Sequence, residues 1–224
     1  MLWGQFLTHD IVLTPGTKIK DVDCSCGSEH PECANIAIEN DSILTSDCIE
    51  MKRSHRTFSE YEGVLYEEQI SVISAFVDGT VVYGTDKELT GTLRHSNRDG
   101  LAISKNGHGV NLLPRTNENS LSPPNRELGS PMMMADDVRK KFEAKPELNE
   151  QELPAFVAGD ARINEHPALQ GMHTIFHLLH NWVADKMLEQ NPSWAGQTDM
   201  LFHEARMVVI ASIQHISYKN YLDG

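Results

Sequence analysis

The chain has 224 residues, of which 40% are hydrophobic and 23% are charged, so it can bury a core of ordinary size. Its formal net charge of −13 argues against nucleic acid or an anionic membrane as the main partner, because both need basic surface. No apolar run approaches the roughly 20 residues of a membrane-spanning helix, and the N-terminus lacks the basic and apolar regions of a signal peptide.

The first ten residues predict a short amphipathic helix. Three apolar side chains follow the i, i+3, i+4 spacing of one face: Trp3, Phe6 and Leu7. Gln5 and His9 are four positions apart and share one face. Asp10 points about 100° away around the helix. This arrangement suits acid–base chemistry by His9 and binding of a hard cation by Asp10. The alternative interpretation is a helix end with a solvated His–Asp pair.

Residues 17–66 are expected to form a loop-rich excursion that holds all the cysteines of the chain: Cys24, Cys26, Cys33 and Cys48. Four cysteines allow three pairings. Their separations do not fit two CxxC knuckles, so two local disulfides are favoured over a zinc site. Disulfides imply an oxidising, extracellular or secretory setting. The glycosylation sequon Asn40-Asp-Ser42 agrees with that setting.

The middle of the chain predicts shorter elements. The pattern favours a helix over 67–77, broken by Asp78-Gly-Thr80, and a short helix over 87–94. Residues 95–135 are rich in Asn, Ser, Pro and Gly and are expected to form surface loop. The mixed charges over 136–142 also allow a helix.

A candidate calcium site lies at alternate positions of the segment 74–80. Four residues there can offer oxygen ligands, namely the hydroxyls of Ser74 and Thr80, the carboxylate of Asp78 and the backbone carbonyl of Phe76. Alternate residues of an extended loop point the same way, and an all-oxygen shell is what Ca²⁺ takes. Asp10 is a natural donor of a further carboxylate. The alternative is a Gly-containing turn that follows a helix.

Two long helices are expected in the second half, over 167–189 and over about 198–218. Pro167 suits a helix start, and an Asn-Pro pair ends the first helix. The expected apolar stripe of the first is Met172, Ile175, Leu179, Trp182 and Met187. That of the second is Ala205, Val208, Val209, Ile213 and Ile216. Alternating strand patterns are scarce, so the sequence predicts a mainly α fold.

Two further groups carry possible chemistry. Arg162 and Glu165 stand just ahead of the first long helix, where an arginine can stabilise negative charge on an oxygen substrate. The alternative is a surface loop with salt bridges. The histidines of that helix are spaced i, i+4, i+7: His173, His177 and His180. They could hold a transition metal. Because no HExxH pattern is present, packing or hydrogen-bonding histidines are favoured.

These motifs occur in one order along the chain. Trp-Gly-Gln5-x-x-x-His9-Asp10 is followed by the cysteines, by Ser-x-Phe-x-Asp-x-Thr80 with Val-Tyr-Gly84, and by Ala-Gly-Asp-x-Arg162-x-x-Glu165. Met172-His-Thr174, His180-Asn181, Glu204-Ala-Arg206 and Gln214-x-Ile-x-Tyr218-x-x-Tyr-Leu222 come next. The set closely resembles the animal haem peroxidases, the superfamily of myeloperoxidase, peroxidasin and peroxinectin, over nearly the whole chain.

The resemblance implies a helical fold that encloses haem b, with residues 1–224 as the N-terminal part of the catalytic domain. It implies His9 as the distal histidine, Gln5 as the distal amide and Arg162 as the distal arginine, with Glu165, His9 and Arg162 next to the cofactor. The implied Ca²⁺ ligands are Asp10, Ser74, Phe76, Asp78 and Thr80. The cysteine order implies the disulfides Cys24–Cys33 and Cys26–Cys48.

The implied activity is a secreted peroxidase that reduces hydrogen peroxide and oxidises a halide, a phenol or a tyrosine. His9 would take a proton from the peroxide and return it to the leaving oxygen, while Arg162 stabilises the charge of O–O cleavage. The competing hypothesis is a catalytically inactive, calcium-stabilised adhesion or binding module with an extracellular-matrix or cell-surface partner.

The sequence departs from the family at three places. Thr8 replaces the aspartate that esterifies a haem methyl in mammalian members, although Glu165 matches the other ester-forming carboxylate. His166 replaces the methionine of the sulfonium link in myeloperoxidase. The proximal histidine of the family is expected beyond Gly224. We therefore interpret the chain as a fragment that retains haem poorly and has little activity by itself.

Overall fold

The computed structural model describes residues 1–15, 22–39, 44, 46–94, 100–101, 103–105, 110–114 and 156–223. The sequon Asn40-Asp-Ser42 and the helix considered over 136–142 lie outside these ranges. Contacts divide the described residues into two compact units. One contains Met1–Ile11 and the residues from Ile73 onward, and the other contains Val12–Val72. None of the helices in the described ranges combines the length and the apolar character that crossing a bilayer requires.

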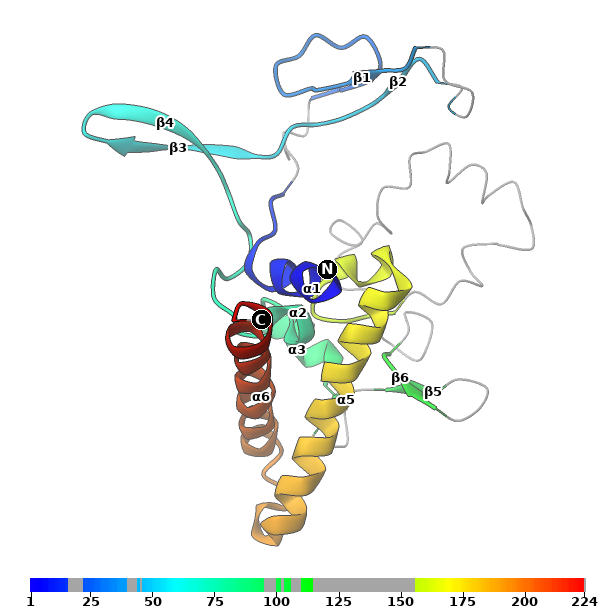
Figure 1. Ribbon diagram of the computed structural model, residues 1–224, viewed down its shortest axis with the longest axis vertical. Helices are drawn as coiled ribbons and strands as arrows, with labels where there is room; N and C mark the ends of the chain where they lie inside the picture. Colours follow the sequence, from blue (N-terminus) through cyan, green and yellow to red (C-terminus); the bar gives the residue numbers. More distant parts are fainter. Residues whose placement is uncertain are drawn as a thin grey trace. The chain divides into compact units, whose positions relative to one another are not determined.

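Helices dominate the first unit, as the sequence predicts (Figure 1). Its α-helices are α1 (Leu2–Ile11), α2 (Thr80–Tyr83), α3 (Lys87–Leu93), α5 (Pro167–Gln190) and α6 (Thr198–His215). Shorter elements are the 3-10 helices η2 (Ala161–Glu165) and η3 (Pro192–Trp194), the π-helical η4 (Ile216–Tyr221), and the paired strands β5 (Ser104–Lys105) and β6 (Asn111–Leu112). The long helices α5 and α6 run side by side and pack against each other.

The core of the first unit joins α1 to the long helices. Buried side chains from several helices form one cluster, which includes Phe6, Val81, Tyr83, Leu169, Phe176, Phe202, Val209 and Ile213. Within it, the ring of Phe6 stacks on the ring of Phe176 with centroids 5.2 Å apart. Burying one such side chain stabilises the fold by about 1.5–3 kcal/mol. This anchor fixes the rotation of α1, which in turn buries His9 and Asp10.

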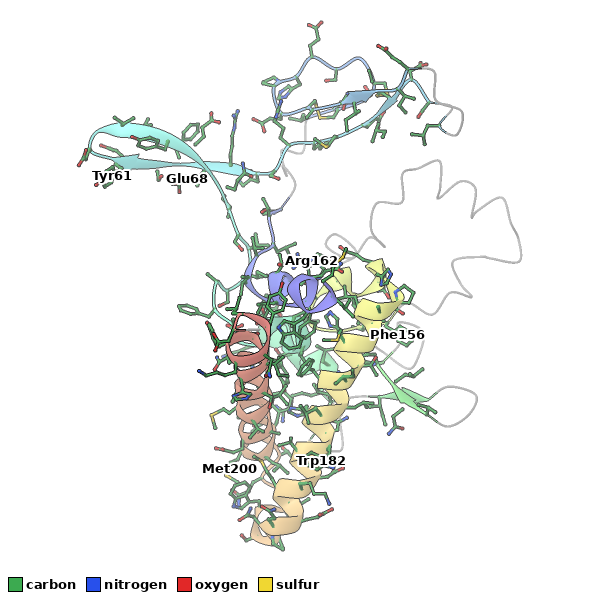
Figure 2. All side chains as sticks on the ribbon, viewed as in Figure 1. Tyr61, Glu68, Phe156, Arg162, Trp182 and Met200 are labelled. Carbon is green, nitrogen blue, oxygen red and sulfur yellow. A yellow bond between two sulfur atoms is a disulfide. The ribbon has the colours of Figure 1, made fainter. Side chains whose placement is uncertain are left out.

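The bounds predicted for the first long helix agree with α5 to within one residue, but its predicted buried face is partly wrong. Ile175 and Trp182 are each 59% exposed; Trp182 is labelled in Figure 2. The buried face instead carries three imidazoles among apolar residues: Leu169, His173, Phe176, His177, His180, Val183 and Ala184. The prediction placed only apolar residues on the buried face. In the structure His173, His177 and His180 are buried there, while the apolar Ile175 and Trp182 are exposed.

The helix predicted over 67–77 is wrong. Val64–Gln69 forms strand β4, which pairs antiparallel with β3 (Arg56–Tyr61) in the register Tyr61↔Val64. The two-residue turn between them, Glu62-Gly63, has positive φ at both positions, 52° and 77°. Such turns match the twist of a hairpin, and glycine supplies one positive φ without strain. The hairpin turn therefore determines the structure of residues 64–69, and the weak helical periodicity of the sequence that follows does not.

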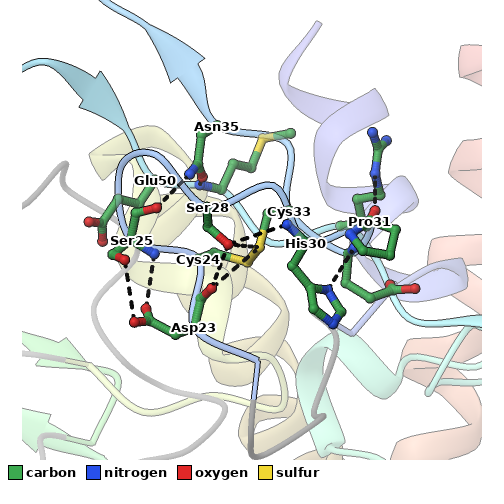
Figure 3. Close-up of a disulfide and its surroundings, with 12 residues drawn as sticks. Asp23, Cys24, Ser25, Ser28, His30, Pro31, Cys33, Asn35 and Glu50 are labelled. Atoms are coloured by element: carbon green, nitrogen blue, oxygen red, sulfur yellow. Dashed lines mark hydrogen bonds between the residues drawn. A yellow bond between two sulfur atoms is a disulfide. The ribbon is translucent and has the colours of Figure 1, made fainter.

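The second unit is held by its disulfides and a small amount of β structure. Both cystines implied by the resemblance are present, Cys24–Cys33 and Cys26–Cys48. Strands β1 (Ile36–Ala37) and β2 (Cys48–Ile49) pair beside them. In Figure 3 the Ser28 hydroxyl donates to the carbonyl of Asp23 at 2.9 Å, which closes the loop around the first cystine. Each disulfide typically stabilises a fold by about 2–4 kcal/mol, so few buried apolar residues suffice here.

The two ends of the segment Val12–Val72 lie next to each other. The backbone N–H of Val72 donates to the carbonyl of Leu13 at 2.9 Å. The N–H of Leu13 donates to the hydroxyl of Ser71 at 3.3 Å. The two ends of the excursion between α1 and Ile73 are thus hydrogen-bonded to each other.

Candidate functional site

Helix α1 and the 3-10 turn η2 bring three of the predicted side chains together. Gln5 and His9 are one helical turn apart, and both reach Glu165 at the end of η2. The Nε2 of Gln5 donates to Oε2 of Glu165 at 3.0 Å. The Nε2 of His9 lies 3.8 Å from the same oxygen. An amide, an imidazole and a carboxylate therefore share one small space, although 156 positions separate His9 from Glu165 in the sequence.

Arg162 lies beside α1 (Figure 2). Its Nη2 donates to the backbone carbonyl of His9 at 3.0 Å. The same guanidinium forms an ion pair with Asp160, in which Nη2 and Oδ2 are 2.6 Å apart. A cation is thus fixed next to the end of α1, where it can stabilise negative charge on a small oxygen substrate.

Asp160 and Gly159 are site residues that sequence reasoning missed as such. Asp160 is the N-cap of η2, and its carboxylate accepts from the backbone N–H of Arg162 at 2.8 Å. A Cβ on Gly159 would lie 2.3 Å from the carbonyl oxygen of Thr80 and 2.6 Å from the backbone nitrogen of Tyr83. Glycine is therefore needed for close approach of two backbones. The capping preference of Asp ahead of a short helix was the available signal.

Burial lowers the pKa of His9, and the Arg162 guanidinium lowers it further, while Asp160 and Glu165 act in the opposite direction. The imidazole is therefore held in the neutral form, which can accept a proton. Within the described part of the chain, Nδ1 of His9 is buried and has no hydrogen-bond partner. The other nitrogen, Nε2, is the one that faces Glu165.

The candidate calcium segment meets the end of α1 at Asp10. The fully buried carboxylate of Asp10 accepts from the backbone N–H of Gly79 at 3.1 Å, from that of Val81 at 2.9 Å and from the Thr80 hydroxyl at 3.1 Å. Burial raises the pKa of Asp10, and these hydrogen bonds act in the opposite direction. The carboxylate of Asp78 accepts from the N–H of Thr80 at 3.3 Å. Asp10, Asp78 and Thr80 are thus brought together.

Ser74 and Phe76 join the same segment through local bonds. The Ser74 hydroxyl accepts from the N–H of Phe76 at 3.1 Å, and the carbonyl of Phe76 accepts from the N–H of Asp78 at 3.0 Å. Gln214 of α6 supports the segment, because its Nε2 donates to the carbonyl of Val77 at 2.7 Å. Across the described ranges, no three His, Cys, Asp or Glu side chains form a metal-binding group. A cation here would therefore need hydroxyl and carbonyl oxygens in addition to the carboxylates of Asp10 and Asp78.

The histidine run of α5 serves packing, as favoured from the sequence. The ring of His173 packs edge-on against Phe6 with centroids 5.2 Å apart. Nδ1 of His180 shares a 2.9 Å hydrogen bond with the hydroxyl of Tyr83. All three histidines of the run are buried in the core. His173 and His180 tie α5 to α1 and α2, the elements that carry the candidate site.

Because these imidazoles are buried, we expect the folded protein to lose stability in acid. Burial lowers the pKa of His173 and of His180 to about 3. The stabilisation from keeping them neutral is fully present above about pH 6.5 and falls as the pH drops below that value, since only the unfolded chain then binds the protons. Each histidine contributes about 1.4 kcal/mol per pH unit in that range.

When the pH falls from 5.5 to 4.5, the free energy of unfolding of His173→Leu should therefore decrease by about 1.4 kcal/mol less than that of the unmodified protein. Urea denaturation at the two pH values measures this difference. His203→Leu, at an exposed position of α6, serves as the matched control. Equal pH dependence in the unmodified protein and in His173→Leu would contradict the prediction.

Comparison with protein families identifies one that covers the whole chain. The family model described as animal haem peroxidase matches residues 1–224. Mouse myeloperoxidase is 32% identical over 99% of this chain and 29% of its own length. Human eosinophil peroxidase is 31% identical over 99% of this chain and 30% of its own length. Peroxidasin of Drosophila melanogaster is 30% identical, with 99% of this chain and 14% of that protein covered. The chain thus spans less than a third of these relatives.

Solved structures show the same fold at lower identity. Peroxidase A from Dictyostelium discoideum aligns with a TM-score of 0.70 at 22% identity, over 99% of this chain and 39% of that chain. Fatty acid alpha-dioxygenase of Oryza sativa aligns with a TM-score of 0.59 at 18% identity, over 96% of this chain and 26% of that chain. At these identities the likeness concerns the arrangement of the helices.

Proposed function

This chain belongs to the animal haem peroxidase family, and from that premise we propose that the protein reduces hydrogen peroxide and oxidises a halide, a phenol or a tyrosine. The observation that carries the proposal is the convergence of Gln5, His9, Glu165 and Arg162 where α1 meets η2. A neutral base can relay the proton of a peroxide, and a fixed cation can stabilise the charge that develops as its O–O bond breaks.

The donor set fits haem b at this position. His9, Glu165 and Arg162 are the residues that would lie next to the cofactor, with the His9 ring kept neutral by burial and the Arg162 charge held by Asp160. Bound haem supplies an iron that passes electrons from the reducing substrate to the peroxide. The protein supplies orientation, proton transfer and electrostatic stabilisation.

Each side chain then has one role. His9 accepts the proton from one oxygen of hydrogen peroxide and returns it to the oxygen that leaves, so that two protons and two electrons convert the peroxide to two waters. Arg162 stabilises the negative charge that develops as the O–O bond breaks. Gln5 holds the Glu165 carboxylate through its 3.0 Å hydrogen bond and offers its amide to a small polar substrate.

We also infer that Ca²⁺ binds next to this site, through Asp10, Ser74, Phe76, Asp78 and Thr80. Support comes from the meeting of Asp10 with the 78–80 turn and from the number of oxygens in that segment. Because Asp10 directly follows His9, a cation that fixes Asp10 also fixes the end of α1. Two disulfides support the inference that the protein is secreted.

Asp78→Ala should lower the thermal stability in the presence of calcium but not in the presence of a chelator, since it removes a carboxylate ligand. With calcium at 100 times its Kd, the stabilisation at stake is about 2.7 kcal/mol. Asp86→Ala is the matched control, because Asp86 caps α3 by accepting from the N–H of Leu89 and should cost the same in both conditions. Equal losses for Asp78→Ala with and without calcium would reject the calcium site.

The direct test of the proposed function uses the protein in which this chain occurs. The purified protein should show a haem absorption band and should oxidise iodide or a phenol only when hydrogen peroxide is added. Absence of haem from protein that was expressed with a haem supply would refute the peroxidase proposal. That result would favour the calcium-stabilised binding module instead.

A further inference from the structure

We propose that Asp160 is a positioning residue for the reaction, because it fixes the guanidinium of Arg162 against the end of α1. The inference deepens the proposed peroxidase function and rests on it. Asp160 acts through Arg162, whose Nε and Nη2 both donate to its carboxylate.

The carboxylate of Asp160 binds Arg162 at three points. Oδ1 accepts from the backbone N–H at 2.8 Å and from Nε at 2.9 Å, while Oδ2 accepts from Nη2 at 2.6 Å. The side chain of Arg162 is therefore folded back along its own backbone and held by a bidentate pair, the strongest arrangement for Arg and a carboxylate. This removes most of the rotamer freedom that a long arginine side chain normally keeps.

Asp160 is itself held by a rigid backbone. Gly159 packs so closely on α2 that a Cβ there would lie 2.3 Å from the carbonyl oxygen of Thr80. The carbonyl of Asp160 accepts from the N–H of Ile163 at 3.3 Å, and the Ile163 side chain is buried. Asp160 is only 6% exposed. Burial of an unpaired carboxylate is costly, and the guanidinium of Arg162 supplies the counter-charge for Asp160.

The consequence is a continuous connection from α2 to the catalytic histidine. It runs from Thr80 through Gly159 and Asp160 to Arg162, whose Nη2 donates to the carbonyl of His9 at 3.0 Å. Preorganised charges stabilise a transition state only when they cannot relax, and a displacement of about 1 Å can cost about 100-fold in rate. Asp160 supplies that restraint for the distal cation.

The test compares Asp160→Asn with Asp199→Asn in the haem-loaded protein. Asp160→Asn keeps the shape but places an NH₂ against the N–H donors of Arg162. Asp199 also forms an ion pair with an arginine, in which Nη1 of Arg94 lies 2.7 Å from Oδ1 of Asp199, but Asp199 is 81% exposed on α6. Two measurements are made: the second-order rate constant for hydrogen peroxide and the dissociation constant of cyanide from the ferric protein, which reports the distal cation without turnover.

Asp160→Asn should slow the peroxide reaction by about 10- to 100-fold and weaken cyanide binding by about tenfold, whereas Asp199→Asn should leave both unchanged. In an Arg162→Gln background, Asp160→Asn should have no further effect, because the two residues act as one unit. Wild-type values for Asp160→Asn, or a full additional loss in the Arg162→Gln background, would overturn the proposal.

Two further outcomes distinguish a failure of the role proposed for Asp160 from a failure of the peroxidase function on which it rests. If Arg162→Gln alone changes neither measurement, the proposed role of Arg162 fails and the premise fails with it. If Asp160→Asn does not fold, Asp160→Glu decides, since it keeps the buried charge but lengthens the arm that holds the guanidinium. Weakened cyanide binding by folded Asp160→Glu supports positioning, and wild-type binding overturns it.

Discussion

Replacing His9 with alanine is expected to slow the reaction with hydrogen peroxide by about 100- to 10,000-fold, the usual contribution of a general acid–base group. The effect should be this large because His9 is the buried neutral imidazole of the site, whereas Gln5 cannot accept a proton. The haem absorption band should persist, since Glu165 and Arg162 remain.

Stopped-flow measurement of the second-order rate constant with hydrogen peroxide tests this expectation. His203→Ala is the matched control, because His203 lies exposed on α6. A His9→Ala protein that keeps its haem and reacts within a few-fold of the unmodified rate would mean that another group transfers the proton. The proposed mechanism would then be wrong even though the family assignment stands.

Gly159→Ala should be the most damaging substitution of a small residue near the site. The new Cβ would meet two backbone atoms of α2 and the backbone nitrogen of Gly84, the nearest at 2.3 Å, and backbone cannot move aside as a flexible side chain can. Forced overpacking of this kind typically costs about 1–3 kcal/mol. Because Gly159 precedes Asp160, the displacement should also reduce peroxide reactivity by moving Arg162.

Gly171→Ala provides the comparison for that experiment. Gly171 lies within α5, where a Cβ would meet nothing within 4 Å, so alanine should leave stability unchanged or raise it by up to about 1 kcal/mol. Chemical denaturation of both variants measures the difference. If Gly159→Ala proves as stable as Gly171→Ala, the two backbones are not in the close contact described above.

Local signals in the sequence were sufficient for the long helices and insufficient for what packs against them. Pro167 and the Asn-Pro pair after Gln190 set the ends of α5 by backbone chemistry alone, so its bounds were predictable. The sequence also favoured a packing role for the histidines of α5, but it could not identify the partners of His173 and His180, because Phe6 and Tyr83 lie in distant elements. The hairpin at Glu62-Gly63 was missed because its first turn residue is not a typical one.

The site shows the same division. Gln5 and His9 could be placed on one helix face from spacing, whereas their meeting with Glu165 depends on tertiary structure across more than 150 positions. Only the order of motifs shared with a known family could suggest it. Asp160 belongs to that motif, but the motif alone indicates no role for it, since the bidentate pair between positions 160 and 162 is visible only in three dimensions.

The hydrogen bonds of Leu13 with Ser71 and Val72 hold the two ends of the excursion together, and this has a consequence for engineering and for divergence among relatives. A segment that leaves and re-enters a scaffold at adjacent points can be trimmed, lengthened or exchanged at small entropic cost. The excursion that contains the disulfides is therefore a suitable place to graft a label or a foreign loop, provided that the hydrogen bonds of Leu13 with Ser71 and Val72 are preserved.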